Sequence, residues 1–189
     1  MNVLAATKKR HDANAEQARR AFANHVVEPI LTSGLHRHWR CAEPGTGIYH
    51  FHVVTFPGRL IVTGDVGFLA VERTTDMIAW ARSAVGSIEY FAEKVPSSIQ
   101  VREYSPEVAE AWFREELLDE DLSDQTREAI ADFIATIDFQ DRHRFYGELY
   151  ASEELSGHVA ACDYPTFEDY TPNFLWCRQA VIWLLEHLD

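Results

Sequence analysis

The sequence predicts an α+β protein in which a four-stranded antiparallel meander carries helices packed mainly on one face. Two observations predict it. Between residues 35 and 73, polar and apolar residues alternate with the period of two that is typical of strands, whereas from residue 74 apolar residues recur every three or four positions, as in amphipathic helices. The chain has 189 residues, enough for one sizeable core, so we expect a single domain over 1–189.

The segment before the sheet divides into two parts. Residues 1–12 offer little that can be buried, and we expect them to be frayed. A helix is predicted over 13–32, ended by Ser33 and Gly34, because apolar residues recur there every three or four positions. These periodic residues are Ala18, Ala21, Phe22, Val26 and Ile30.

Three glycine-containing turns divide the sheet region. The turns lie at 43–47, 56–59 and 64–67, and the first two also contain proline. We therefore expect four strands, over 36–42, 48–55, 59–64 and 67–73.

Residues 74–189 are expected to be mostly helical. Thr74 or Thr75 is a suitable N-cap for a helix through Ala84, and Ser105 followed by Pro106 is a typical helix start. Helices are expected over 74–84, 87–95, from 106, from 123, over 141–155 and over 173–188, with irregular chain over 156–172.

Composition excludes several classes of function. The chain has 30 acidic and 17 basic residues and a formal net charge of −13, so phosphate groups would be repelled, which argues against direct binding of nucleic acid or anionic membranes. No apolar run is long enough to cross a bilayer, and the first residues lack the apolar core of a secretory signal. Three cysteines without a pairing pattern fit free thiols in a reducing compartment. We therefore expect a cytoplasmic protein.

Short motifs follow one another in a fixed order through the sheet region. They are Trp39-Arg40-Cys41, Pro44-Gly45-Thr46, Tyr49-x-Phe51, Pro57-Gly58-x-Leu60, Gly64-Asp65-x-Gly67 and Arg73-x-x-Asp76-Met77. This ordered set resembles a family of small proteins carried by bacteriophages and prophages. The resemblance implies an accessory role in the cytosol of an infected bacterium, and it implies no catalytic residues.

The turns predict an approximate register for the sheet. The expected cross-strand pairs are His38 with His52, Arg40 with His50, Val53 with Val62, His52 with Thr63 and His50 with Asp65. Because side chains alternate between the faces of a strand, each face then collects one kind of residue. The apolar face is expected to hold Trp39, Cys41, Tyr49, Phe51, Val53, Leu60 and Val62. The polar face is expected to hold His36, His38, Arg40, His50, His52, Thr63 and Asp65.

This polar face has three interpretations. It can simply be the solvent-exposed face of an antiparallel sheet. It can bind an anion, with Arg40 gripping a phosphate group and histidines adding donors. It can also bind a divalent metal such as Zn²⁺ or Mn²⁺, although no cofactor is required. The candidate anion-binding residues are Arg40, His38, His50, His52, Thr63, Asp65 and Arg73. The candidate metal ligands are His36, His38, His50, His52 and Asp65.

Hydrolysis is a further capacity of such a face. His50, His52 and Asp65 are the candidate catalytic residues for a phosphodiesterase-type reaction, because two imidazoles can act as general acid and base. Together with the resemblance, this suggests a phage counter-defence protein that captures, or hydrolyses, a small anionic nucleotide signal. A homo-oligomer is compatible with this hypothesis.

A strongly acidic segment supports an alternative function. Residues 103–141 contain thirteen acidic residues but only two basic ones, Arg114 and Arg127. These charges fit the solvated outer faces of helices. They also fit a surface that imitates nucleic acid and inhibits a basic host defence protein.

Overall fold

The computed structural model describes residues 2–163 and 165–188, and its contacts divide the chain into two compact units. Unit 1 comprises the residues up to Arg10 together with Arg102–Asp169, and unit 2 comprises His11–Val101 together with the residues from Tyr170. Each unit has a hydrophobic core of its own, whereas we expected one domain with one core.

Unit 2 contains a five-stranded antiparallel sheet in the order β1-β2-β3-β4-β5. Each strand pairs with its neighbour in sequence, so the predicted antiparallel meander is confirmed, with one strand more than expected. The strands are β1 (Val26–Ser33), β2 (His36–Ala42), β3 (Phe51–Phe56), β4 (Arg59–Gly64) and β5 (Leu69–Glu72). Unit 2 also contains the second part of helix α1 (Val3–Ala21) and three whole helices, α2 (Met77–Ala84), α3 (Ile88–Ala92) and α8 (Pro172–Glu186).

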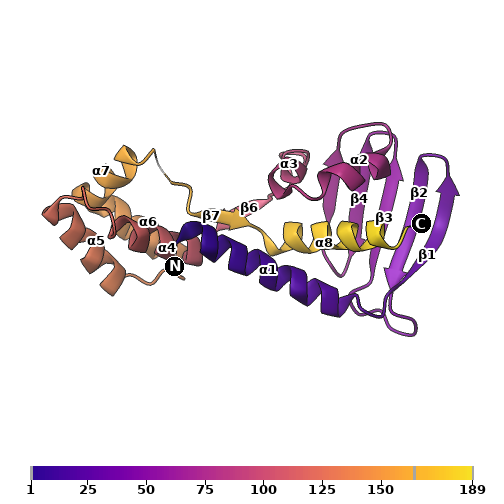
Figure 1. The fold of residues 1–189 in the computed structure, drawn as a ribbon, viewed down its shortest axis with the longest axis horizontal. Helices are drawn as coiled ribbons and strands as arrows, with labels where there is room; N and C mark the ends of the chain where they lie inside the picture. The colour runs from indigo at the N-terminus through magenta and orange to yellow at the C-terminus, as the bar shows by residue number, and fades with distance from the viewer. Residues whose placement is uncertain (1, 164, 189) are drawn as a thin grey trace. The chain divides into compact units, whose positions relative to one another are not determined.

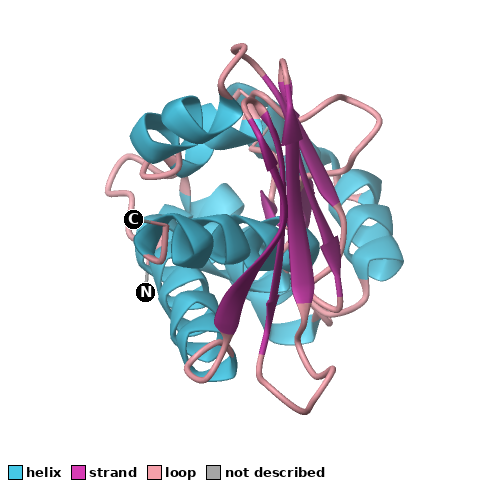
Figure 2. Cartoon of the chain, turned by 90° about the vertical axis from the view of Figure 1, so that its right-hand side faces the viewer, coloured by secondary structure: helices cyan, strands magenta, loops and turns pink. Residues whose placement is uncertain are grey.

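Helices α2 and α8 pack on one face of the sheet, as the sequence predicts. Both helices contact β4, and α2 also contacts β3 (Figure 1). Figure 2 shows the strands edge-on, with the C-terminus, just beyond α8, to one side of them. The core on this side is built from aromatic and aliphatic residues. Its fully buried members include Phe22, Phe51, Val53, Leu60, Val62 and Phe174.

The prediction of a helix over 13–32 is wrong at its C-terminal end. Helix α1 (Val3–Ala21) stops before His25, and residues 26–33 form the edge strand β1. The misleading residues are Val26 and Ile30, because a spacing of four satisfies the helical period and also the period of two of a strand. Ser33 ends β1, and Gly34 and Leu35 form the turn to β2, where Gly34 has a φ of 59°.

The expectation that residues 1–12 are frayed is also wrong over 3–12, since α1 begins at Val3, and residue 1 lies outside the described residues. Within unit 1, the Val3 amide donates to Glu115 and the Arg10 guanidinium contacts Asp169 and Glu103. Ala6 is buried as well. These contacts fix the start of α1 in place, although the composition of this segment suggested that little of it could be buried.

Asp76, rather than Thr74 or Thr75, caps helix α2. Its carboxylate accepts hydrogen bonds from the amides of Ile78 and Ala79, and both of its oxygens lie 3.1–3.2 Å from the Arg37 guanidinium. The Arg37 hydrogen bond first, and then the amide of Ala79, lowers the pKa of Asp76 below its ordinary value. A depressed carboxyl pKa stabilises the fold above the ordinary pKa, and this stabilisation is lost as the pH falls through the depressed value.

Replacing Asp76 with alanine is therefore expected to lower the free energy of unfolding by about 1 kcal/mol at neutral pH, the usual contribution of an N-cap. Urea unfolding of wild type and Asp76→Ala at pH 7 and pH 3 measures the effect. The difference is expected to shrink at pH 3, because protonation weakens the carboxylate's bonds to Arg37 and to the amides. A constant difference would contradict this assignment.

Unit 1 is helical apart from two short strands. Its elements are the first part of α1, β6 (Arg102–Tyr104), α4 (Pro106–Glu116), α5 (Asp124–Thr136), α6 (Arg142–Ala151), α7 (Glu153–Ala161) and β7 (Glu168–Tyr170). The predicted starts of α4 and α5 are confirmed, with Ser105 and Ser123 as N-caps. Phenylalanine rings from α4, α5, α6, the α5–α6 connection and the residue before β7 contribute to its core; they include Phe113, Phe133, Phe139, Phe145 and Phe167.

The region from 141 differs from the prediction. We expected one helix over 141–155 and irregular chain after it, but α6 ends at Ala151 and α7 continues to Ala161. Ser152 separates them because its hydroxyl caps α7 by accepting from the Leu155 amide. Strand β7 also lies in the segment that we expected to be irregular. Among the described residues, no helix is long and apolar enough to cross a membrane.

Candidate functional site

The register places the polar residues on one face of the sheet, as predicted. His52 pairs with Thr63 and Val53 with Val62, which confirms the predicted register between β3 and β4. Between β2 and β3 the prediction is displaced by two residues, because Arg40 pairs with His52 and His38 pairs with Val54. An even displacement leaves every side chain on its predicted face. Burial along β3 alternates accordingly, with Phe51 and Val53 buried and His52 half-buried.

The displacement arises at the start of β3. We expected this strand to begin at residue 48, but it begins at Phe51. Tyr49 has a φ of 56°, so the chain turns there instead of continuing as a strand. The Tyr49 ring is exposed and stacks on Trp176, with 5.5 Å between the ring centroids, and so does not belong to the apolar face where we expected it.

We call His38, Arg40, His50, His52, Thr63 and Asp65 the histidine face. At its centre His38 Nε2 lies 2.8 Å from His52 Nδ1, so one ring donates a hydrogen bond to the other. Burial and the nearby His38, His50 and Arg40 lower the pKa of His52 below its ordinary value. His52 is therefore neutral at neutral pH, although the Glu28 carboxylate opposes this shift of its pKa.

His50 and Asp65 form a second pair at the edge of the histidine face. His50 Nδ1 lies 3.1 Å from Asp65 Oδ2 and 2.8 Å from the carbonyl oxygen of Gly47. The backbone amide of Asp65 donates to the carbonyl of His50, which fixes the two residues side by side. The rings of His50 and His52 are edge to face, with centroids 5.8 Å apart. Three of the four predicted imidazoles therefore gather on this face.

Arg40 has a partner that the sequence analysis missed. Its guanidinium lies 3.4 Å from Glu28 Oε2, because β1 pairs with β2 and places Glu28 directly opposite Arg40. This pair could not be predicted as long as residues 13–32 were expected to form a helix, because Glu28 in that helix would not face β2. Both side chains are more than a third exposed, and such a pair contributes at most about 1 kcal/mol. A competing anion can therefore displace the Glu28 carboxylate at small cost.

Two predicted site residues lie away from this centre. His36 is exposed beside the β1–β2 turn, paired with Ser33. Arg73 follows β5, and its amide bonds to the carbonyl of Gly58 in the turn between β3 and β4. His50 and Asp65 lie at the other end of these strands, so Arg73 is not part of the histidine face.

An apolar strip continues the histidine face along the strands. Val54 and Ile61 pair with each other, and each lies two residues from His52 or Thr63 on the same strand and therefore on the same face. Both side chains are half-buried. The face thus joins hydrogen-bond donors and a cation to an apolar surface, a combination that suits a ligand with an anionic and a planar or apolar part.

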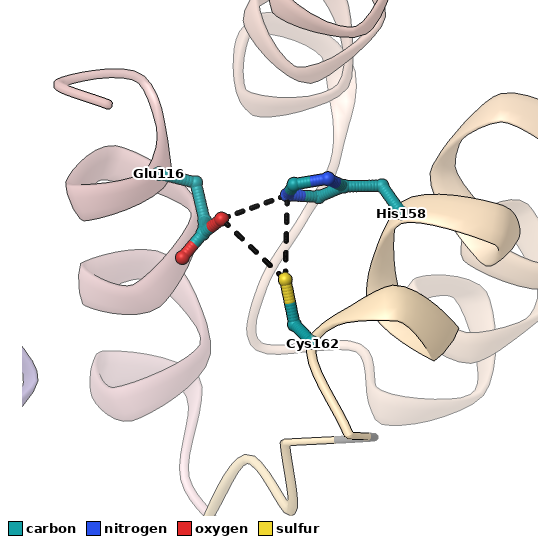
Figure 3. A group of neighbouring side chains, drawn as sticks. All are labelled: Glu116, His158 and Cys162. Carbon is teal, nitrogen blue, oxygen red and sulfur yellow. Dashed lines mark hydrogen bonds and ion pairs between the residues drawn. The ribbon is translucent and has the colours of Figure 1, made fainter. Parts of the chain in front are cut away.

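A second group of polar side chains lies in unit 1 (Figure 3). It consists of Glu116, the last residue of α4, His158, in the last turn of α7, and Cys162, the C-cap of α7; we call it the Glu116 cluster. Glu116 Oε2 lies 2.8 Å from His158 Nε2, and Cys162 Sγ lies 3.8 Å from that oxygen and 3.9 Å from that nitrogen. Partial desolvation of the Cys162 thiol, and then the carboxylates of Glu116, Asp119 and Asp163, raise its pKa above the ordinary value.

This cluster was not predicted from the sequence. The only local signal was the spacing of four between His158 and Cys162, which places both on one side of a helix. We expected irregular chain over 156–172, so a helical spacing was not considered for this segment. Glu116 belongs to the acidic segment 103–141, whose charges we interpreted as surface charges. Within residues 2–163 and 165–188, this is the one group that brings three potential metal-ligand atoms within 4.8 Å of one another. The predicted ligands on the sheet, His36, His38, His50, His52 and Asp65, do not gather in that way.

Comparisons with known proteins add no identity to this geometry. No family model, no curated protein and no solved structure matches the chain.

Proposed function

We propose that the histidine face captures a small phosphate-bearing ligand of the nucleotide class. The observation that carries the proposal is the position of His52, half-buried between Arg40 on β2 and Thr63 on β4, within hydrogen-bond distance of His38. A guanidinium, imidazole nitrogens and a hydroxyl here offer donors on three neighbouring strands. Phosphate oxygens are acceptors that such donors recognise, and arginine can bind them with two parallel hydrogen bonds.

The neighbouring apolar strip supports a nucleotide rather than a free phosphate ion. Val54 and Ile61 offer a surface on which a base can lie while its phosphate group contacts Arg40 and His52. The resemblance to phage-borne proteins supports an accessory role for this capture, such as removal of a nucleotide signal used in bacterial defence. Hydrolysis of the ligand is an extension of the proposal, with neutral His52 as the proton acceptor beside His50 and Asp65.

The first test compares two arginines of the same sheet face. Arg40→Ala is expected to weaken the binding of the captured nucleotide about tenfold to a hundredfold, because a charged hydrogen bond contributes about 1.5–3 kcal/mol. Arg59 is the matched control, since it lies on the same face, opposite Phe56, and pairs with Glu72. Arg59→Ala removes the same charge away from His52, so its affinity is expected to stay within about twofold of wild type.

The ligand itself is found by a melting-temperature screen against cyclic di- and trinucleotides and ADP-ribose derivatives. A ligand at 100 times its Kd adds about 2.7 kcal/mol to stability, which gives a clear shift. Isothermal titration then measures the variants, and chromatography of the mixture reports hydrolysis. Equal losses in Arg40→Ala and Arg59→Ala would contradict the assigned site, because they would indicate attraction by net charge alone.

The affinity for the anion is expected to rise as the pH falls from 8 to 6. The pKa of His52 is lowered in the free protein, so the ring is neutral at pH 8, and a bound phosphate group stabilises its protonated form. Uptake of one proton changes the affinity by at most about tenfold per pH unit. Titrations at pH 6, 7 and 8 on wild type and His52→Gln measure this slope, which should be reduced in the variant. An unchanged slope would assign the proton uptake to another group.

A further inference from the structure

We propose that Glu116, His158 and Cys162 bind a Zn²⁺ ion, with a water molecule as the fourth ligand. The three side chains come from the ends of α4 and α7, both in unit 1, and point toward one another in the space between these helix ends (Figure 3). Nothing in the capture of an anion by unit 2 requires this cluster, so the proposal stands independently of the proposed function.

The pattern of contacts is that of ligands around one point. Glu116 and Cys162 both approach the same nitrogen of His158, Nε2, and the thiol also approaches the carboxylate oxygen that contacts this nitrogen. In a nucleophilic triad, the carboxylate would instead contact the other ring nitrogen and orient the ring toward the thiol. A nucleophilic cysteine also needs a cationic environment, whereas Asp119 and Asp163 add negative charge here.

The distances are close to those of a tetrahedral zinc site. Zn²⁺ binds sulfur at about 2.3 Å and nitrogen or oxygen at about 2.0–2.2 Å, which places tetrahedral ligand atoms about 3.3–3.6 Å apart. The three separations in the cluster are 2.8, 3.8 and 3.9 Å. Small side-chain rotations that part Glu116 from His158 and bring Cys162 inward are sufficient to accept the ion.

The surroundings hold the first two ligands in place and leave one side open. The side chains of His158 and Glu116 are 14% and 20% exposed, respectively, and the ring of Trp112 lies beside His158, with 5.8 Å between centroids. The Arg127 guanidinium donates to the carbonyls of Leu117 and Asp119, which fixes the chain just after α4. Cys162 is exposed, so an ion and a water molecule can enter from its side.

The donor set selects the metal. Thiolate and imidazole together favour Zn²⁺ over Mg²⁺, Ca²⁺ and Mn²⁺, which prefer oxygen ligands. Three protein ligands with water in the fourth position are the arrangement of catalytic rather than structural zinc sites. The proposed site therefore holds an exchangeable Lewis acid, in contrast to the closed Cys₄ or Cys₂His₂ sites on which small folds depend.

The test uses the full-length protein, freed of metal by a chelator, and Zn²⁺ in competition with a chromophoric chelator. Wild type is expected to bind one Zn²⁺ per chain, and Cys162→Ser, His158→Gln and Glu116→Gln are each expected to weaken this binding more than about tenfold, since even residues that only orient metal ligands contribute about 10–100-fold. His143→Gln is the matched control, because His143 is an exposed histidine of unit 1 outside the cluster. It is expected to bind as wild type does.

Co²⁺ provides a readout that a purely structural cluster would not give. The proposal predicts a thiolate-to-cobalt charge-transfer band that disappears in Cys162→Ser, because the other two cysteines, Cys41 and Cys177, are buried. The band is expected to remain in His52→Ala, because His52 lies in unit 2, outside the cluster. Circular dichroism checks that each variant is folded. We expect Cys162→Ser to fold as wild type does, because Cys162 is exposed. Absence of one-to-one binding in wild type, or binding unaffected by the three cluster substitutions, would overturn the proposal. A Co²⁺ spectrum lost in His52→Ala would instead place the metal on the histidine face.

Discussion

Replacing Phe51 with alanine is expected to lower the free energy of unfolding by about 3–5 kcal/mol, whereas His52→Ala should cost less than about 1 kcal/mol. Phe51 is fully buried, and its ring packs against Phe22 and Trp183, with centroids 5.0 and 5.8 Å away. His52, the next residue of the same strand, points to the other face. The contrast between two neighbouring residues therefore tests the alternation on which the histidine face depends.

Urea unfolding followed by tryptophan fluorescence measures both variants, since four of the five tryptophans lie in unit 2. Val53→Ala extends the comparison, because Val53 is fully buried on the same face as Phe51. Similar losses for Phe51→Ala and His52→Ala would show that both side chains are buried, and the assigned register would then be wrong.

Replacing Gly64 with alanine is expected to have the second large effect, a loss of about 3 kcal/mol or more. Gly64 has a φ of 123°, a conformation open almost only to glycine, and this strain alone costs about 1–3 kcal/mol. A Cβ atom at this position would also lie 2.5 Å from the backbone oxygen of His50 and 2.8 Å from the Cα of Phe51. These are backbone atoms, so the steric clash with the added Cβ is removed only if β3 and β4 move apart.

Gly86 is the matched control. A Cβ there would meet no atom within 4 Å, so Gly86→Ala is expected to be neutral or slightly stabilising. Gly64 also precedes Asp65, which pairs with His50, so any Gly64→Ala protein that folds should bind the captured nucleotide more weakly. Thermal unfolding and the titration described above measure both effects. Equal stability of the two alanine variants would contradict the close approach at Gly64.

The sheet was predictable because two independent signals agree there. The turn at Pro57-Gly58 fixes the pairing of β3 with β4, and the alternation of Phe51, His52 and Val53 fixes the faces. The loop before β3 gave no such constraint. Nothing in its sequence shows that the chain turns at Tyr49, so the register of β2 with β3 was off by two residues.

The elements missed by sequence reasoning lack a local signal of their own. Strand β1 is almost wholly exposed and has a bulge between Pro29 and Leu31, so it has neither the alternation nor the burial of a typical strand. Its pairing with β2 places Glu28 beside Arg40, a contact between distant residues. The Glu116 cluster likewise joins positions 42 residues apart, through a side-chain contact between α4 and α7 that no periodicity reveals.

The most direct test of ligand capture on the histidine face is a histidine NMR titration of the full-length protein with the nucleotide panel. The ring resonances of His38, His50 and His52 are expected to shift with at least one phosphate-bearing member. His143 in unit 1 and His187, whose ring stacks on Trp183, provide internal controls and are expected not to move. Shifts confined to His143 or His187, or no shift of His38, His50 and His52 with any member of the panel, would contradict the account.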